Sequence, residues 1–480
     1  MARPPYVQVN FQPTRGRRVS GDDIVRTLGL EVSAGRLPSG ARLPPVRALE
    51  LQLGISKNTV QSAYDELCAR GVLVAREREG VFVAERAAAR YPDRQLSAPA
   101  PRFAELASER QRLPVPGVTP LGMVFIDPEL LPREKLSECF RSVLNIPGLH
   151  ALYDAQGYPP LRQAIAARLR RRGMDVAEDE IVITTGSQQA LDVVCRALRH
   201  RRIASENPVY HLAKELFESH GAELTGLRLD PFGDIPWDEW RSALGRARPE
   251  LLYSVTSFHN PTGRSYSTHE LEEIVTLANE FGFALLEDDW GSDMLSAGEY
   301  RPTLRALAGN NVLYANSFTK KLLPSLRLGF VAGNRDSVPA LVAAKRVATL
   351  GNPTLIEAAL CELLERGYYD THLATMQAEL DRRYTACLET LDACMPPEVR
   401  WTTPGGGPLL WLEVPKRVDL ARLSARTLER KVELSLRERA FFGAPHLHGL
   451  PIGFAFLKTE ALVSALEVLG QELRAELERS

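Results

Sequence analysis

The stretch SFTKKLLPSLRLGF, residues 317–330, decides the fold prediction for this chain. It follows an apolar run at residues 312–315, which is typical of a buried strand. A lysine amine can form an imine with a carbonyl compound, and Lys320 stands between Ser317 and Arg327, two residue types suited to a phosphate. Lys320 is therefore the candidate for a covalent site, whereas Lys321 beside it is expected to be a solvated surface cation.

Outward from this stretch, short apolar runs alternate with amphipathic ones. Strands are predicted at residues 181–183, 251–255, 283–286 and 312–315, and helices at 188–198 and 270–281. Strands that alternate with helices favour a doubly wound, mostly parallel α/β sheet, in which ligands bind beyond the carboxyl ends of the strands. A smaller C-terminal α/β subdomain is predicted from about residue 375, with a long final helix at 459–479.

Polar residues stand where these strands end. Gly186, Ser187 and Gln188 lie between a strand and a helix start, where backbone N–H groups and the helix dipole favour a phosphate. Asp288 ends a strand and can pair with a pyridinium nitrogen. Asp289 next to it is expected to be an ordinary cap or surface charge.

Two more residues complete the pattern. Asn260, in a turn by composition, can donate to a phenolic oxygen, and Tyr210 can stack on a ring. Pyridoxal phosphate needs an amine for its aldehyde, a phosphate cradle and an acid for its ring nitrogen. Each residue alone also fits a turn, a core aromatic or a surface charge, but the set in chain order predicts a pyridoxal phosphate site.

The first 85 residues predict three helices followed by a two-stranded wing. Helices are expected at 24–33, 46–53 and 57–70, and strands at 72–75 and 81–83. The tight turn at 53–56 joins the second and third helices, so the segment reads as a helix-turn-helix.

Candidate DNA contacts follow from this arrangement. The third helix presents Lys57, Asn58 and Thr59 in its first turn, where recognition helices meet base edges and phosphates. Arg76 and Arg78 lie in the wing and are expected to meet phosphates or the minor groove. The alternative is a helical dimerisation domain with surface charges.

Composition separates these two regions. Residues 86–116 are rich in Ala, Pro, Arg and Ser and show neither helical nor strand periodicity. They therefore predict a linker, with one helical turn near 103–110. The domains are therefore 1–85, a winged helix, and 117–480, the α/β body. Their net charges are +3 for residues 1–85 and −4 for the remainder, which is compatible with nucleic-acid binding at one end.

Six scattered cysteines without a CxxC pair predict reduced thiols in a cytoplasmic protein, with no disulfide frame and no metal site. No apolar run approaches the roughly 18 residues of a membrane span, so no membrane partner is expected.

Residues 35–73, GRLPSGARLPPVRALELQLGISKNTVQSAYDELCARGVL, with GVFV at 80–83, resemble the winged-helix domain of the GntR regulators. The resemblance implies that Arg47, Lys57 and Thr59 face DNA. The family usually has Arg where Lys57 stands and Ser where Pro45 stands. Lysine keeps the charge but loses bidentate guanine recognition, so Lys57 is expected to hold phosphate.

Residues 120–475 resemble the fold-type I aminotransferases. The matching stretches are YDAQGYPPLRQAI (153–165), ITTGSQQALDVV (183–194), ENPVY (206–210), HNPTG (259–263), EDDW (287–290) and SFTKKLLPSLRLGF (317–330). The resemblance implies Lys320 as the Schiff-base lysine, Asp288 as the ring-nitrogen partner and Asn260 as the phenolic-oxygen partner. It implies Tyr210 as the ring that stacks on the cofactor and Tyr153 as the residue that reaches the phosphate bound to the partner subunit. The phosphate cradle that it implies consists of Gly186, Ser187, Ser317 and Arg327.

A winged helix fused to this fold resembles the MocR subfamily of GntR regulators. The resemblance implies a homodimer that exchanges winged helices, and a transcriptional regulator that binds promoter DNA. Its body would sense pyridoxal phosphate or a small amine or amino acid. The alternatives are a working aminotransferase with a DNA-binding appendage, and a regulator whose body is only a dimerisation scaffold.

Two departures from the family pattern bear on activity. Trp290 stands where the family has a tyrosine, and an indole offers one N–H donor but no acidic hydroxyl. Pro451 stands where the aminotransferases carry the arginine that binds the substrate carboxylate, and no arginine lies between Arg439 and Arg474. Because a buried carboxylate without a partner costs several kcal/mol, little transaminase turnover is expected. The nearby basic groups are His446, His448 and Lys458.

Overall fold

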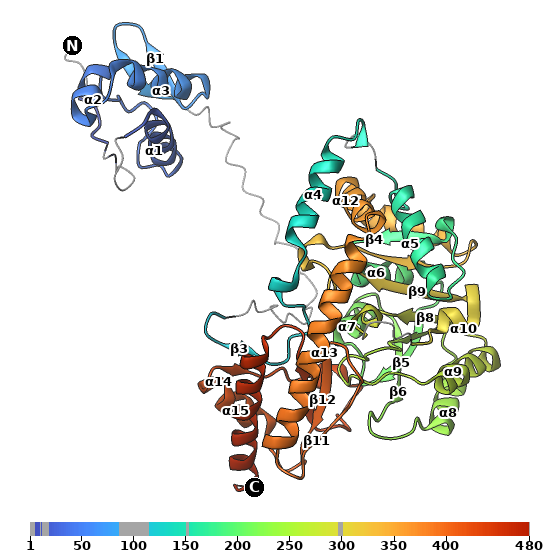
Figure 1. Cartoon of the computed structure of the whole chain (residues 1–480). Helices are drawn as coiled ribbons and strands as arrows, with labels where there is room; N and C mark the ends of the chain where they lie inside the picture. The colour runs from blue at the N-terminus through green and yellow to red at the C-terminus, as the bar shows by residue number, and fades with distance from the viewer. Residues whose placement is uncertain are drawn as a thin grey trace, which may run out of the picture. The chain divides into compact units, whose positions relative to one another are not determined.

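The computed structural model describes residues 5–9, 11, 19–85, 115–149, 153–295 and 301–479. The chain divides into two compact units, Met1–Ala104 and Glu105–Ser480 (Figure 1). The linker predicted at 86–116 and its helical turn lie almost wholly outside the described residues.

The N-terminal unit contains three helices and a hairpin. These are α1 Gly21–Ser33, α2 Val46–Leu53, α3 Lys57–Ala69, β1 Leu73–Arg76 and β2 Gly80–Val83. Gly54 ends α2 in the left-handed conformation (φ 64°), which glycine adopts without strain, and the Ser56 side chain caps α3. Val60 and Tyr64 of α3 pack on Ile24 of α1 in one buried cluster. The helix-turn-helix and its wing are confirmed.

A seven-stranded sheet forms the centre of the second unit. Its strands are β4 Ile181–Thr184, β5 Arg202–Asn207, β6 Glu223–Arg228, β7 Leu251–Ser254, β8 Ala284–Asp288, β9 Val312–Ser317 and β10 Gly329–Ala332. The order is β4-β10-β9-β8-β7-β5-β6, and only β10 runs against its two neighbours. The predicted doubly wound, mostly parallel sheet is therefore confirmed.

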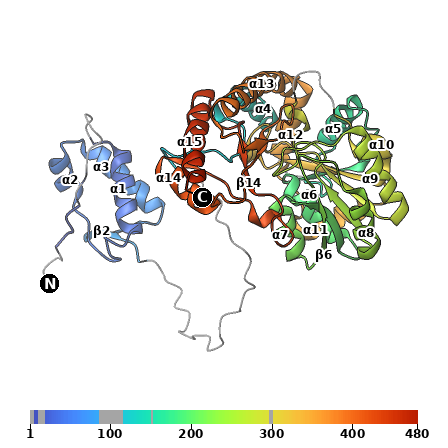
Figure 2. The ribbon, with the colours of Figure 1, turned by 90° about the horizontal axis from the view of Figure 1, so that it is seen from below.

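Helices cover both faces of this sheet (Figure 2). They are α4 Arg133–Leu144, α5 Pro159–Arg171, α6 Ser187–Ala197, α7 His211–Ser219, α8 Trp237–Ala247, α9 Thr268–Phe281, α10 Leu304–Ala308, α11 Val338–Thr349 and α12 Thr354–Glu365. Because strand side chains alternate, Leu285 packs with Trp240 of α8 on one face, while Leu286 packs with Leu191 of α6 on the other. Both faces are buried, as expected for a parallel sheet.

A smaller C-terminal subdomain follows the sheet, and its elements gather apart from it in Figure 1. They are α13 Tyr368–Cys394, β11 Arg400–Trp401, β12 Leu409–Glu413, α14 Leu420–Glu429, β13 Val432–Glu433, β14 Gly449–Gly453 and α15 Thr459–Leu477. β11, β12 and β14 form an antiparallel sheet, and β13 pairs in parallel with β3 Thr119–Pro120. None of the helices in the described ranges is long and apolar enough to cross a membrane.

Candidate functional site

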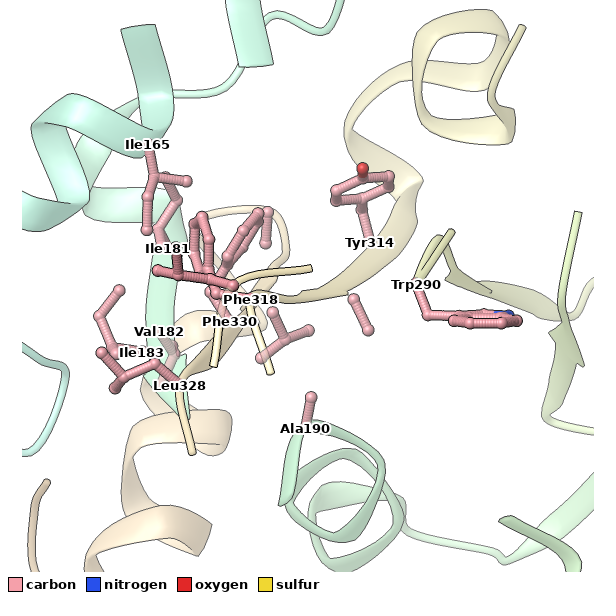
Figure 3. Packing of buried hydrophobic residues seen from close by; sticks show 14 of the residues in the cluster. Ile165, Ile181, Val182, Ile183, Ala190, Trp290, Tyr314, Phe318, Leu328 and Phe330 are labelled. Atoms are coloured by element: carbon pink, nitrogen blue, oxygen red, sulfur yellow. The ribbon is translucent and has the colours of Figure 1, made fainter. Parts of the chain in front are cut away.

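Lys320 follows the carboxyl end of β9 and lies against two aromatic rings. Its Nζ is 4.1 Å from the ring centroid of Trp290 and 5.4 Å from that of Tyr210. Burial lowers the pKa of the amine to about 8, while Asp288 acts in the opposite direction. Figure 3 shows Trp290 apart from the packed group of Ile181, Val182 and Phe330. The amine therefore loses its proton far more readily than an exposed lysine does.

Asp288 ends β8, and its main chain is paired with that of Ala315 in β9, so the carboxylate and Lys320 belong to neighbouring strand ends. The side chain is 2% exposed. Its Oδ2 accepts a hydrogen bond of 3.0 Å from the Tyr253 hydroxyl, whereas the buried Oδ1 has no partner among the described residues. Burial raises the pKa of Asp288 to about 6, against the opposing charge of Lys320. One carboxylate oxygen is thus available for a donor.

Gly186, Thr319 and Arg327 converge beside the start of α6. Gly186 has a φ of 98°. A Cβ built on it would lie 3.2 Å from the Thr319 Oγ1 and 3.6 Å from an Arg327 terminal nitrogen. The Ser317 hydroxyl accepts from the Thr319 amide at 3.2 Å, and α6 begins at Ser187. A hydroxyl, a guanidinium and a helix N-terminus therefore surround a position that only glycine leaves open.

Three other residues predicted for the site are Asn260, Gln188 and Tyr153. Asn260 is buried. Gln188 extends from α6 to α7, where its Nε2 donates to the Leu212 carbonyl at 3.0 Å, while its Oε1 is buried without a partner among the described residues. Tyr153 is 63% exposed and packs beside Gly351, so its proposed reach into a partner subunit stays a prediction.

Two sequence-based expectations were wrong. Lys321 is not a solvated cation, because it is 0% exposed and its Nζ donates to Asp293 at 3.0 Å and to Asn316 at 2.6 Å. Asp289 is not a cap or a surface charge, because it too is 0% exposed. Its Oδ2 accepts from Arg172 at 3.0 Å and from the Tyr314 hydroxyl at 2.5 Å. Both form part of a buried ionic network beneath the strand ends.

Sequence reasoning also missed Thr319 and Tyr253. Thr319 stands inside the quoted motif, so its polar side chain one residue before the lysine was the available signal. Tyr253 lies in the strand β7 next to β8, and only strand order reveals that its hydroxyl meets Asp288. No single-sequence pattern gives that order.

The predicted DNA-contacting residues lie on the surface of the N-terminal unit. Arg47 of α2 and Lys57 and Asn58 of α3 are exposed. Thr59 is half-buried, and its hydroxyl shares a hydrogen bond of 2.8 Å with that of Ser56. The start of α3 therefore presents a cation and an amide to solvent, while Thr59 also stabilises the helix start.

The wing arginines are exposed as well. The Arg76 guanidinium lies 4.7 Å from the Phe82 ring centroid and 3.8 Å from the Glu85 carboxylate. Arg78 occupies the hairpin turn with a φ of 63°. Arg76 is thus held against the wing by weak contacts, which a phosphate can replace.

Comparison with known families decides what these two units are. Residues 21–83 match the family of bacterial regulatory proteins, gntR family, and residues 129–446 match aminotransferase class I and II. The chain belongs to the GntR-type regulators that carry a class I and II aminotransferase domain. The resemblance to MocR regulators is confirmed.

Individual relatives of this GntR-type regulator include both regulators and enzymes. It is 27% identical to the probable rhizopine catabolism regulatory protein MocR of Rhizobium meliloti, over 92% of this chain and 91% of that protein. It is 31% identical to the 2-aminoadipate transaminase of Thermus thermophilus, over 75% of this chain and 91% of the enzyme. The solved structure of LysN, the α-aminoadipate aminotransferase of Thermus thermophilus, complexed with N-(5′-phosphopyridoxyl)-L-leucine, superposes with a TM-score of 0.72. It is 30% identical, and the match covers 78% of this chain and 97% of LysN.

Aminotransferases of this fold depend on pyridoxal phosphate, and the residues of this GntR-type regulator fit that cofactor. The open Oδ1 of Asp288 suits a pyridinium N–H, and the Gly186, Thr319 and Arg327 cradle suits a phosphate. Lys320 has the lowered pKa that Schiff-base chemistry needs.

Proposed function

We propose that this chain is a DNA-binding transcriptional regulator whose aminotransferase-like domain binds pyridoxal phosphate through a Schiff base with Lys320. The domain senses the cofactor itself or a small amine or amino acid that reacts with it. The observation that carries the proposal is that one chain holds both an exposed recognition helix and a half-buried lysine beside a buried aspartate that has an open carboxylate oxygen. Acting on promoter DNA places the protein in the cytoplasm.

Different residues would bind different parts of the cofactor. When bound, pyridoxal phosphate supplies an aldehyde for the amine and a ring that withdraws electrons. Asp288 would accept a hydrogen bond from the ring N–H, Asn260 would donate to the phenolic oxygen, and Tyr210 would provide the stacking ring. Gly186, Ser187, Ser317 and Arg327 would hold the phosphate, with Thr319 added and Gln188 beside the same helix start. The open Asp288 oxygen favours this role over a body that serves only as a dimerisation scaffold.

In the same proposal the protein is a homodimer. The exposed Tyr153 would reach the phosphate of the partner subunit, and the two subunits would exchange their winged helices. Two recognition helices then meet two half-sites, as in other dimeric helix-turn-helix proteins.

The regulatory role is tested by selecting genomic DNA fragments that bind the full-length protein, with and without pyridoxal phosphate. A common promoter motif is expected, and its occupancy should change at least several-fold when the cofactor or a responsive amine is present. Binding without sequence preference in both conditions, together with brisk transamination, would favour the appended-enzyme alternative.

The DNA surface is tested by Arg47→Ala, because an exposed arginine at a phosphate contact releases about one counterion. Affinity should fall several-fold at all sequences, and the slope of log affinity against log salt should flatten by about 1. Arg36→Ala is the matched control, since Arg36 is an exposed arginine of the same unit that pairs with Glu31 at 2.8 Å. Equal effects of the two changes would remove Arg47 from the interface.

A further inference from the structure

The edge of the central sheet opposite the cofactor residues carries a group of exposed arginines. β5, β7, β8 and β9 run parallel, so their amino ends lie at the edge opposite the strand ends that position Asp288 and Lys320. The chain around the start of β5 and just before β7 contains five exposed arginines, which are Arg199, Arg201, Arg202, Arg246 and Arg248. These five residues are called the arginine patch below.

Hydrogen bonds join the two segments of the arginine patch. The Arg202 Nε donates to the Arg248 carbonyl at 3.0 Å, and the Glu250 amide donates to the Arg202 carbonyl at 2.8 Å. The neighbouring Arg201 is held by its Nε, which donates to the Cys195 carbonyl at 3.2 Å at the end of α6. Two segments that lie 46 residues apart in sequence therefore form one surface.

No carboxylate of the described residues forms an ion pair with any of these five guanidinium groups. Two carboxylates of the same region are bonded to other groups. Asp192 accepts from Arg196 at 2.9 Å and lies 2.6 Å from the His220 ring, while Glu250 accepts from the His200 amide at 2.7 Å. The arginine patch thus keeps its charge available to solvent.

The arginine patch differs from other exposed arginines of the second unit, several of which pair with carboxylates. These pairs include Arg335 with Asp179 at 3.3 Å, Arg382 with Glu379 at 2.7 Å, and Arg417 with Glu398. Residues 86–480 also carry a net charge of −4, so the patch is a local departure from an acidic region. Because like charges held together repel each other, five arginines without carboxylate partners are best explained by an anionic ligand.

The chemistry of the arginine patch fits the phosphates of a nucleic-acid duplex. A guanidinium can donate two parallel hydrogen bonds to one phosphate, and duplex DNA presents a row of phosphates to a row of arginines. Proteins that bind single strands add aromatic side chains on which bases stack. Residues 199–202 and 246–248 contain no phenylalanine, tyrosine or tryptophan, so the patch suits the backbone of a duplex and not exposed bases.

We infer that the arginine patch binds the phosphate backbone of the DNA that flanks the site recognised by the winged helix. The inference rests on the proposed function, because it adds a second DNA-contacting surface to the same regulator. Contacts to phosphates carry no sequence information, so the winged helix selects the site and the patch adds affinity. DNA held at the amino ends of the strands leaves the opposite edge, with Lys320 and Asp288, free for the cofactor.

The test compares two DNA duplexes on the full-length protein. One duplex just covers the selected promoter motif, and the other extends it on both sides by about 50 base pairs, which is well below the persistence length of DNA. The wild-type protein should bind the extended duplex at least threefold more tightly. The slope of log affinity against log salt should also be steeper by about 2 or more, since each neutralised phosphate contributes about 0.9. Hydroxyl-radical footprinting should show protection of the flanking backbone.

The variant Arg199→Gln/Arg248→Gln removes two charges of the patch whose side chains make no hydrogen bond to another described residue, so the fold should be kept. On the extended duplex its salt slope should flatten by about 2, while binding to the short duplex stays unchanged. Arg382→Gln/Arg417→Gln is the matched control, since it removes two exposed arginines of the same unit that already pair with carboxylates. The control should behave like the wild type on both duplexes.

The inference is overturned if the wild type gains neither affinity nor slope from the extended duplex, or if Arg199→Gln/Arg248→Gln keeps the same gain as the control. Tighter binding of the wild type to duplex RNA of the same length than to the extended DNA would also overturn it. Failure of the proposed function looks different, because the protein would then select no promoter motif and would bind the short duplex without sequence preference.

Discussion

Lys320 and Lys321 are neighbours in the chain and sit in opposite surroundings. The Lys320 amine lies over the Trp290 and Tyr210 rings, beside a carboxylate with an open oxygen. The Lys321 amine is fully buried and donates to Asp293 and Asn316. A binding site needs a polar side chain with an unused hydrogen-bonding position. A buried polar side chain whose hydrogen bonds are made within the protein instead stabilises the fold around it.

The substitution Lys320→Ala tests the difference between the two lysines most strongly. We expect complete loss of the visible absorption band that pyridoxal phosphate gives with the wild-type protein, because the neighbouring Lys321 amine is already bonded to Asp293 and Asn316. Borohydride reduction followed by peptide mapping checks the assignment, since the label should be on residue 320. A band that persists in the variant would refute the assignment of the Schiff-base lysine.

Lys321→Met should leave the absorption band in place and destabilise the fold. Removing one partner of a buried ion pair lowers the free energy of unfolding by about 3 kcal/mol or more. We expect a loss near the lower value, because Asp293 keeps Arg168 at 3.3 Å and the Tyr369 hydroxyl at 3.1 Å. Urea unfolding measures the loss. Lys320→Met is the matched control and should cost less than about 1 kcal/mol. Similar losses for the two variants would contradict the distinction drawn between the lysines.

The uptake of pyridoxal phosphate by the apoprotein should depend on pH with a midpoint near 8. Only the neutral amine attacks an aldehyde, and burial lowers the pKa of Lys320 to about 8 from the ordinary value of 10.5. Uptake should therefore slow about tenfold per pH unit below the midpoint and level off above it. Stopped-flow absorbance measures the rate. A rate that still rises steeply between pH 9 and 10 would show an ordinary exposed amine.

The same depressed pKa has a consequence for stability. Between about pH 8 and 10.5 the unfolded chain binds the proton that the folded chain has lost, so this lysine makes the apoprotein more stable as pH rises through that range.

Trp290→Phe should produce the smallest effect. A phenyl ring attracts the charged amine less strongly than indole does, by roughly 0.5 kcal/mol, so the uptake midpoint should fall by roughly 0.4 pH unit. The spectrum of the variant with bound cofactor also reports whether the buried Trp290 N–H, which has no partner among the described residues, donates to the cofactor. An upward shift of the midpoint would contradict the ring contact.

Much of the architecture was predictable because local signals sufficed. The Gly54 turn and the Ser56 cap mark the helix-turn-helix, and alternating apolar runs mark the parallel sheet. The site was predictable to the extent that Asp288 ends a strand and that Gly186 and Lys320 closely follow one. Their roles in holding a cofactor stay predictions until they are measured.

The sequence by itself determined which residues stand at the strand ends, because strand period and motif spacing are local properties. Only the tertiary structure decided which of two adjacent lysines and two adjacent aspartates are buried in the ionic network. Their partners, Arg172 and Asp293, come from other elements, and the ionic partner of Asp289 lies 117 residues away in sequence. The structure also showed that the segment after Arg437 lies against the Tyr210 connection, more than 200 residues earlier. Burial and charge compensation depend on which distant segments meet, and no pattern within a short window records that.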